Sequence, residues 1–168
     1  LYRFKDPEDS RVYVYSDFEP FNANKLFPCF DQPDLKAPFT LKVEAPADWL
    51  VVSATRETAL ADGPAARKQW TFPPTPKLSP YIFSLHAGEY AVWASTAGVV
   101  PLRLFARHSL ARYVDAEEWF ETTRAGLDFY GRYFGLAYPF GKYDQLIVPD
   151  YNGGAMENVG AVTFSERY

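Results

Sequence analysis

Residues 143–160 read Tyr-Asp-Gln-Leu-Ile-Val-Pro-Asp-Tyr-Asn-Gly-Gly-Ala-Met-Glu-Asn-Val-Gly, an apolar run followed by a polar, glycine-rich loop. Residues 143–148 predict a strand. Two adjacent glycines after it, Gly153 and Gly154, would let another backbone approach closely. An extended peptide could then pair along this edge, with Glu157 receiving a positive charge. The alternative on physical grounds is an ordinary surface turn whose glutamate is solvated.

A helix is predicted upstream of this strand. Apolar residues recur at spacings of three and four between Asp115 and Phe134, which marks one buried helix face. Asp115 followed by Glu118 resembles a capping box, and Gly135 stands where the helix would stop. A further strand is expected at 162–165, after the loop. The C-terminal part of the chain is therefore predicted to be α+β.

The first hundred or so residues predict β structure. Short runs rich in Val, Tyr, Phe and Trp are separated by turn signals such as Asp62-Gly63-Pro64. This pattern indicates an antiparallel β-sandwich. Because the pattern changes near Arg107, we place a domain boundary there, between 1–107 and 108–168. The strands expected before it are 11–16, 39–45, 50–54, 69–72, 81–86, 89–95 and 100–106.

Composition excludes several classes of function. The 168 residues carry a formal charge of −4, which gives no reason to expect nucleic acid or an anionic membrane as a partner. No run approaches the ~20 apolar residues of a membrane helix, and the first residues do not resemble a signal peptide. The single cysteine, Cys29, fits a reducing compartment, so we expect a cytoplasmic protein. The chain lacks an initiator methionine, and we expect both of its ends to lie within a longer protein.

The two histidines predict no metal centre. His86 and His108 lie far apart, and neither is followed by Glu, so no His-Glu-x-x-His helix can form. We expect both histidines to pack or to form hydrogen bonds within β structure. No metal ligands and no complete catalytic apparatus are predicted in this segment.

Residues 154–158 resemble the Gly-Ala-Met-Glu-Asn exopeptidase motif of the aminopeptidase N family of zinc peptidases. Three further blocks, at 27–37, 79–90 and 138–144, resemble that family in the right order, so the resemblance covers nearly the whole chain. It implies that 1–107 form the second half of a saddle-like N-terminal β domain. Residues 108–168 would begin a thermolysin-like catalytic domain, whose zinc-binding helix would lie beyond this chain.

The resemblance assigns the family's amine-binding positions to two carboxylates, Glu19 and Glu157. An ammonium group has three donors and no acceptor, so carboxylates from both parts of the chain would satisfy it. Asp17 stands where family members commonly have Gln. If it faces the same cleft it would add a third negative charge, and the alternative is that it points to solvent.

The rest of the motif is also assigned to substrate binding by the resemblance. Gly154 and Ala155 would hold the main chain of the substrate. Met156 and Asn158 complete the motif and are predicted with the substrate-binding residues.

The resemblance implies a zinc-dependent aminopeptidase that removes N-terminal residues from peptides with a free amine. Zinc would belong to the intact parent protein, with none bound here, and the segment alone would be inactive. One alternative is an epoxide hydrolase of the leukotriene A4 hydrolase type. The other is a non-enzymatic, peptide-binding member that has lost its zinc.

Overall fold

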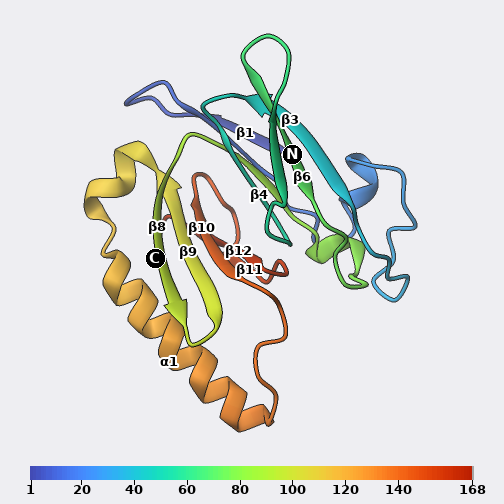
Figure 1. Ribbon diagram of the computed structural model, residues 1–168, viewed down its shortest axis with the longest axis vertical. Coiled ribbons are helices and arrows are strands. Elements are labelled where there is room, and N and C mark those ends of the chain that lie inside the picture. Colours follow the sequence, from blue (N-terminus) through green and yellow to red (C-terminus); the bar gives the residue numbers. More distant parts are fainter. Residues whose placement is uncertain (168) are drawn as a thin grey trace.

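The computed structural model describes residues 1–167, which form three β-sheets and one long helix arranged in layers (Figure 1). The outer sheet is antiparallel and has the order β3 (Leu41–Pro46), β6 (Arg67–Phe72), β5 (Ala59–Asp62). The middle sheet is also antiparallel, with the order β1 (Tyr2–Lys5), β2 (Val12–Tyr15), β7 (Leu85–Gly88), β4 (Leu50–Ser53). The mixed sheet has the order β11 (Ala155–Met156), β12 (Ala161–Ser165), β10 (Tyr143–Val148), β9 (Val100–Arg107), β8 (Tyr90–Ala97). Helix α1 (Ala116–Phe134) covers the far face of the mixed sheet.

The middle sheet is buried on both faces because alternate residues of its strands enter two different cores. On β4, Val51 packs toward the outer sheet, and its neighbour Val52 packs toward the mixed sheet. On β7, Ala87 belongs to the outer-sheet core. His86 therefore points the other way, in register with Tyr15 of β2 and Val52 of β4.

The mixed sheet shows the same alternation. Leu104 of β9 and Ile147 of β10 pack against Phe120 of helix α1. Phe105 and Leu146, one residue along each strand, pack against the middle sheet. The middle and mixed sheets therefore share one core, and this core joins the N-terminal and C-terminal parts of the chain.

Helix α1 begins and ends as its sequence predicts. The Asp115 side chain accepts a hydrogen bond from the Glu118 N–H at 3.1 Å, and Gly135 ends the helix in the left-handed conformation, with φ of 65°. The short 3₁₀ helix η3 (His108–Tyr113) leads into it. Within residues 1–167 the structure contains no helix of the length and apolar character that crossing a membrane requires.

The strand predicted at 81–86 is largely wrong. Pro80–Ile82 form a 3₁₀ helix, η2, because proline fixes φ at a helical value at its first position, and β7 begins only at Leu85. Strands β1, β5 and β11 were not predicted, and neither was the 3₁₀ helix η1 (Ala23–Lys25). The remaining predicted strands are present with shifted ends, and Tyr143–Val148 has the expected bounds.

The mixed sheet extends across the boundary predicted between residues 107 and 108. Strand β9 pairs in parallel with β10, and β8 pairs with β9, so Tyr90–Arg107 belong to the same sheet as the C-terminal strands. The chain passes from the middle to the mixed sheet at Glu89. Where one independently folding domain ends and the next begins stays a prediction.

Candidate functional site

The segment after β2 presents two carboxylates because buried and exposed residues alternate along it. Ser16 and Phe18 are 1% exposed, whereas Asp17 is half-buried and Glu19 is exposed. Ser16 fixes the segment to β7, since its N–H donates to the Leu85 carbonyl at 2.9 Å and its Oγ accepts from the Leu85 N–H at 2.8 Å. Asp17 accepts a hydrogen bond from the Glu19 N–H at 3.3 Å, which holds the turn between them.

The motif strand β11 shows the same alternation at the edge of the mixed sheet. Ala155 and Glu157 face outward, whereas Met156 and Asn158 are buried. Strand β11 pairs with β12 on one side and is the first strand of its sheet. Its other edge has no neighbouring strand within residues 1–167, so its main-chain groups are open to a further strand.

Tyr151 lies between these two segments. Its side chain is 6% exposed, and its ring meets the Tyr15 ring edge-on at 6.1 Å between centroids. Burial raises the pKa of the Tyr151 hydroxyl, and the negative charges of three nearby carboxylates raise it further, namely those of Asp17, Glu19 and Glu157. Carboxylates from segments about 140 residues apart in the sequence therefore act on one hydroxyl group.

No ion pair neutralises these three carboxylates within the part of the chain that the structure describes. Three negative charges that act on one hydroxyl make this part of the surface attractive to a cation. The arrangement can therefore bind a small cation, such as an ammonium group, from solvent.

Gly153 is needed for the position of the Tyr151 ring. A Cβ at residue 153 would lie 2.9 Å from Tyr151 Cε1, closer than side chains pack. Asp150, directly before the ring, has φ of 52°, which turns the chain sharply at the end of β10. Its carbonyl oxygen accepts a hydrogen bond from the Tyr15 hydroxyl at 3.4 Å.

The structure brings together most of the residues that the sequence predicts as a site. Asp17, Glu19 and Glu157 gather near Tyr151, and Gly154 and Ala155 lie exposed at the sheet edge. The side chains of Met156 and Asn158 point inward instead, because outward and inward positions alternate along the strand. Met156 packs in the core between the two sheets, and Asn158 forms hydrogen bonds with Ile82 and Thr163. A contact of either residue with substrate stays a prediction.

Tyr151 lies near the three carboxylates, although the sequence did not assign it to the site. His86 was predicted to pack and form hydrogen bonds within β structure, and the structure confirms that it does. His108 is exposed, so the same prediction is wrong for its side chain. The proximity of Tyr151 to the motif was visible in the sequence, but its burial beside Tyr15 was not.

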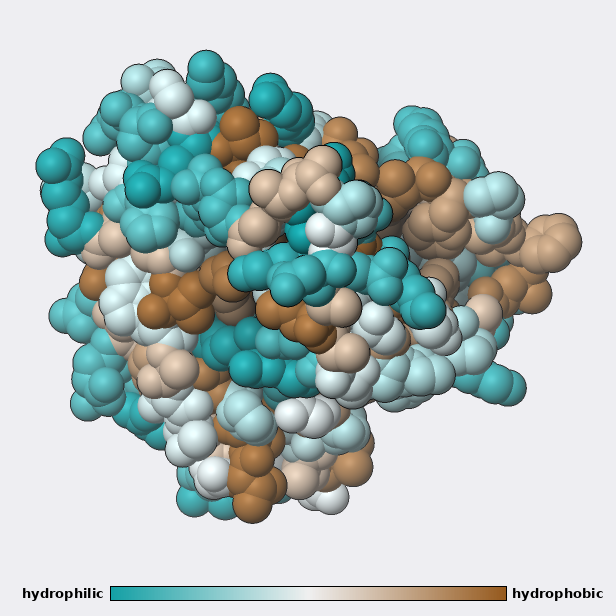
Figure 2. Space-filling view, turned by 45° about the horizontal axis from the view of Figure 1, so that its top comes forward, coloured by the Kyte–Doolittle hydropathy of each residue, from teal (hydrophilic) through white to brown (hydrophobic). Residues whose placement is uncertain are grey.

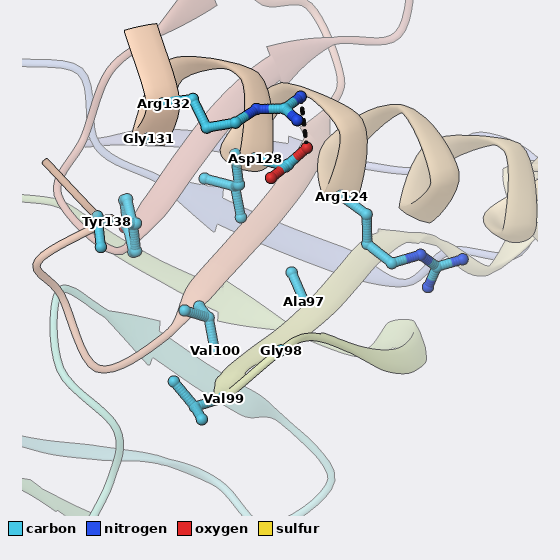
Figure 3. Close-up of a pocket in the computed structure, with 11 residues that line it drawn as sticks. Ala97, Gly98, Val99, Val100, Arg124, Asp128, Gly131, Arg132 and Tyr138 are labelled. Carbon is cyan, nitrogen blue, oxygen red and sulfur yellow. Dashed lines mark ion pairs between the residues drawn. The ribbon is translucent and has the colours of Figure 1, made fainter. Parts of the chain in front are cut away.

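Two hollows border helix α1, and neither contains the three carboxylates. One, of about 560 Å³, lies between the helix and the β8–β9 turn; Figure 3 shows Asp128 and Arg132 paired with each other on the helix above it. The other, of about 680 Å³, lies between the helix and the mixed sheet and reaches Ala155 of the motif. Figure 2 shows hydrophobic and hydrophilic residues intermixed over one face of the molecule.

The described residues do not provide a metal centre. Within residues 1–167, no group of three or more His, Cys, Asp or Glu side chains is placed to hold a metal ion. Asp17, Glu19 and Glu157 do not form such a group.

Comparison with known proteins agrees with this architecture. The model of the Peptidase M1 N-terminal domain matches residues 1–82, and that of the Peptidase family M1 domain matches residues 118–168. Aminopeptidase N of Streptomyces lividans is 44% identical over 172 residues, which cover 100% of this chain and 20% of the relative. Aminopeptidase Ey of Gallus gallus is 32% identical, over 94% of this chain and 17% of the relative. Aminopeptidase N of Oryctolagus cuniculus is 33% identical, over 93% of this chain and 16% of the relative.

The two family models, matched in this order along the chain, place it in the class of M1 peptidase proteins, with the M1 N-terminal domain matched first and the M1 domain after it. The chain belongs to peptidase family M1, in the group of the aminopeptidase N relatives. It spans about a fifth of the length of these relatives.

Proposed function

We propose that this chain is the amine-recognition part of a longer protein, the parent, which removes N-terminal residues from peptides. The observation that carries the proposal is that the negative charges of Asp17, Glu19 and Glu157 all act on the buried Tyr151, which follows β10 and precedes the free edge of β11. Family membership and the aminopeptidase names of the relatives support the same activity.

The carboxylates would bind the α-ammonium group of the substrate. An ammonium carries three N–H donors, and each charge-assisted hydrogen bond contributes about 1.5–3 kcal/mol. Because Glu19 follows a strand of the middle sheet and Glu157 follows a strand of the mixed sheet, they can approach the amine from two sides. A blocked N-terminus would leave the carboxylates desolvated and without a counter-charge, so substrates with a free amine would be selected.

The edge of β11 would align the peptide. A substrate in extended conformation can pair with the exposed main chain near Gly154 and Ala155, as an added strand does. With the amine held at Glu157 and the backbone held at β11, the peptide bond after the first residue occupies a fixed place. The zinc that the family implies would be held by parent residues outside this chain, and the cytoplasmic location expected from the sequence is part of the same proposal.

The test is a pair of charge-neutralising variants of the parent, Glu157→Gln and Glu19→Gln. We expect each to lower kcat/KM for an alanyl chromogenic amide by about 100-fold or more, since removing one member of a desolvated ion pair costs about 3–5 kcal/mol. Glu121→Gln, an exposed glutamate on α1, is the matched control and should leave kcat/KM within about twofold.

The N-acetylated amide should resist cleavage by every form of the parent. An effect of Glu157→Gln below about threefold would remove Glu157 from the amine site. A parent that cleaves neither substrate would instead be a non-enzymatic peptide-binding member of the family.

A further inference from the structure

A buried chain of hydrogen bonds joins the middle sheet to the loop that carries Glu157. His86 Nε2 lies 2.9 Å from Thr163 Oγ1, and the Thr163 hydroxyl donates to Asn158 Oδ1 at 3.0 Å. Asn158 Nδ2 in turn donates to the Ile82 carbonyl at 3.4 Å. His86 and Thr163 are 0% exposed and Asn158 is 1% exposed, so water does not compete for these bonds.

The direction of each bond follows from counting protons. The Ile82 carbonyl can only accept, so the amide nitrogen of Asn158 must face it and the amide oxygen must face Thr163. Thr163 has one proton and gives it to that oxygen. Its own oxygen must then accept from His86, which therefore carries its proton on Nε2, while Nδ1 has no partner within residues 1–167.

The position of Glu157 depends on these hydrogen bonds, which run from His86 through Thr163 to Asn158. Its carboxylate forms no ion pair within the described residues, so the main chain on either side sets where it points. On one side Met156 is anchored in the core between the two sheets. On the other side Asn158 is held through its oxygen by Thr163 and through its nitrogen by Ile82, and the Val159 N–H also donates to the Ile82 carbonyl at 3.2 Å.

We propose that His86 is a positioning residue for amine recognition: through Thr163 and Asn158 it fixes the loop that holds Glu157 opposite Glu19. The proposal rests on the proposed function, because it assigns Glu157 to the substrate amine. It also explains why a polar imidazole, that of His86, is buried at a position where packing alone would be satisfied by an apolar side chain. The neighbouring positions that face the same way, Tyr15 and Val52, fill this core with aromatic and aliphatic groups.

The test compares two substitutions of His86 in the parent. His86→Gln keeps an N–H donor near the position of Nε2, whereas His86→Leu fills the space without a donor. We expect His86→Leu to raise KM for the free-amine alanyl amide about tenfold with kcat within about threefold, because ground-state amine binding is weakened. His86→Gln should restore KM to within about twofold of the wild type. Thr163→Val removes the hydrogen bonds to His86 and Asn158 without leaving a cavity, so it should raise KM as His86→Leu does. It replaces His86→Leu in the test if that variant does not fold.

Ser53→Ala is the matched structural control. It removes a buried hydrogen bond of the same sheet, from Ser53 Oγ to the Ser84 carbonyl at 2.7 Å, without touching the chain to Asn158. It should lower the melting temperature and leave KM unchanged. If KM rises in His86→Leu but not in His86→Gln or Ser53→Ala, the rise cannot be assigned to a general loss of stability.

A double-mutant cycle with Glu157→Gln decides whether His86 acts through Glu157. In the Glu157→Gln background, His86→Leu should change KM by no more than about twofold. Full additivity would overturn the proposal, as would an unchanged KM in His86→Leu and Thr163→Val, or a His86→Gln variant as impaired as His86→Leu. If Glu157→Gln itself has no effect, the proposed amine site fails first, and the proposal fails with it.

Discussion

At the residue scale, His86 makes the folded state sensitive to acid. Burial is the main cause that lowers its pKa to about 3; the positive charge of Lys142 adds to this effect, and the negative charge of Asp144 opposes it. An unfolded histidine has a pKa of about 6.5. Between about pH 6.5 and pH 3 the unfolded chain therefore binds a proton that the folded chain does not bind. The stability contributed by neutral His86 is complete above about pH 6.5 and is lost as the pH falls.

We expect the wild-type parent to lose about 2 kcal/mol more stability than His86→Gln between pH 7 and pH 5, because each unit of pKa difference is worth about 1.4 kcal/mol. The measurement is the free energy of the unfolding transition that includes this region, at both pH values. His108→Gln, which changes an exposed histidine, should keep the acid sensitivity of the wild type. Equal losses in wild type and His86→Gln would show that His86 takes up its proton in the folded state.

The sequence could identify single residues of the site only where a motif names them. Glu157 follows from residues 154–158, and Glu19 from its place before the block at 27–37. The role proposed for His86 could not be predicted, because its partner Thr163 lies 77 residues away and the block at 79–90 that contains His86 assigns no function to it. Contacts between distant positions follow from the packing of sheets, which local patterns do not encode.

At the element scale, the strands that the sequence predicts well are those with distinct or apolar faces. Strand β10 is buried on both sides and was predicted with its true bounds. Strand β5 (Ala59–Asp62) is exposed throughout, so no alternation marks it. Strand β11 has only two residues, and its pairing with β12 depends on the loop that joins them.

We expect the turn between β11 and β12 to require glycine at position 160. Gly160 has φ of 66°, and a Cβ there would lie 2.3 Å from the Ala54 carbonyl oxygen. Gly98, in the β8–β9 turn, has φ of 58° and open space around it, so Gly98→Ala measures backbone strain alone, about 1–2 kcal/mol. We expect Gly160→Ala to lose about 1–3 kcal/mol more stability than Gly98→Ala, because the added methyl group overpacks the contact with Ala54. Melting curves of the two variants measure the difference. Equal costs would show that the contact with Ala54 relaxes freely.

At the scale of the whole molecule, one core explains why distant parts of the sequence meet. The middle and mixed sheets share the cluster that includes Tyr15, Val52, Leu146 and Met156. The segment with Glu19 leaves one sheet and the motif with Glu157 leaves the other, so packing the two sheets forms the acidic site. Composition and strand patterns predicted that both regions exist, but only the resemblance suggested that they meet.

A buried ionic network reinforces this core from within. Asp144 on β10 is 0% exposed and accepts hydrogen bonds from Arg103 Nε at 2.9 Å and from Lys142 Nζ at 2.7 Å. Lys142 also donates to the Gly160 carbonyl at 2.6 Å, and Glu57 lies 3.6 Å from Arg103. The network thus links the loop after β4 to β9, to β10 and to the turn before β12. Burial is the main cause that lowers the pKa of Lys142 to about 8.

We expect Asp144→Asn to destabilise the parent by about 3–5 kcal/mol at pH 7, because Arg103 and Lys142 then remain buried with too little negative charge. Asp128→Asn breaks the exposed pair with Arg132 and should cost no more than about 1 kcal/mol. Raising the pH to 9 should reduce the cost of Asp144→Asn, since Lys142 can lose its proton there and one unpaired charge disappears. Melting curves of both variants at pH 7 and pH 9 measure these differences. A cost for Asp144→Asn as small as that of the control would mean that water reaches the network and that the shared core rests on apolar packing alone.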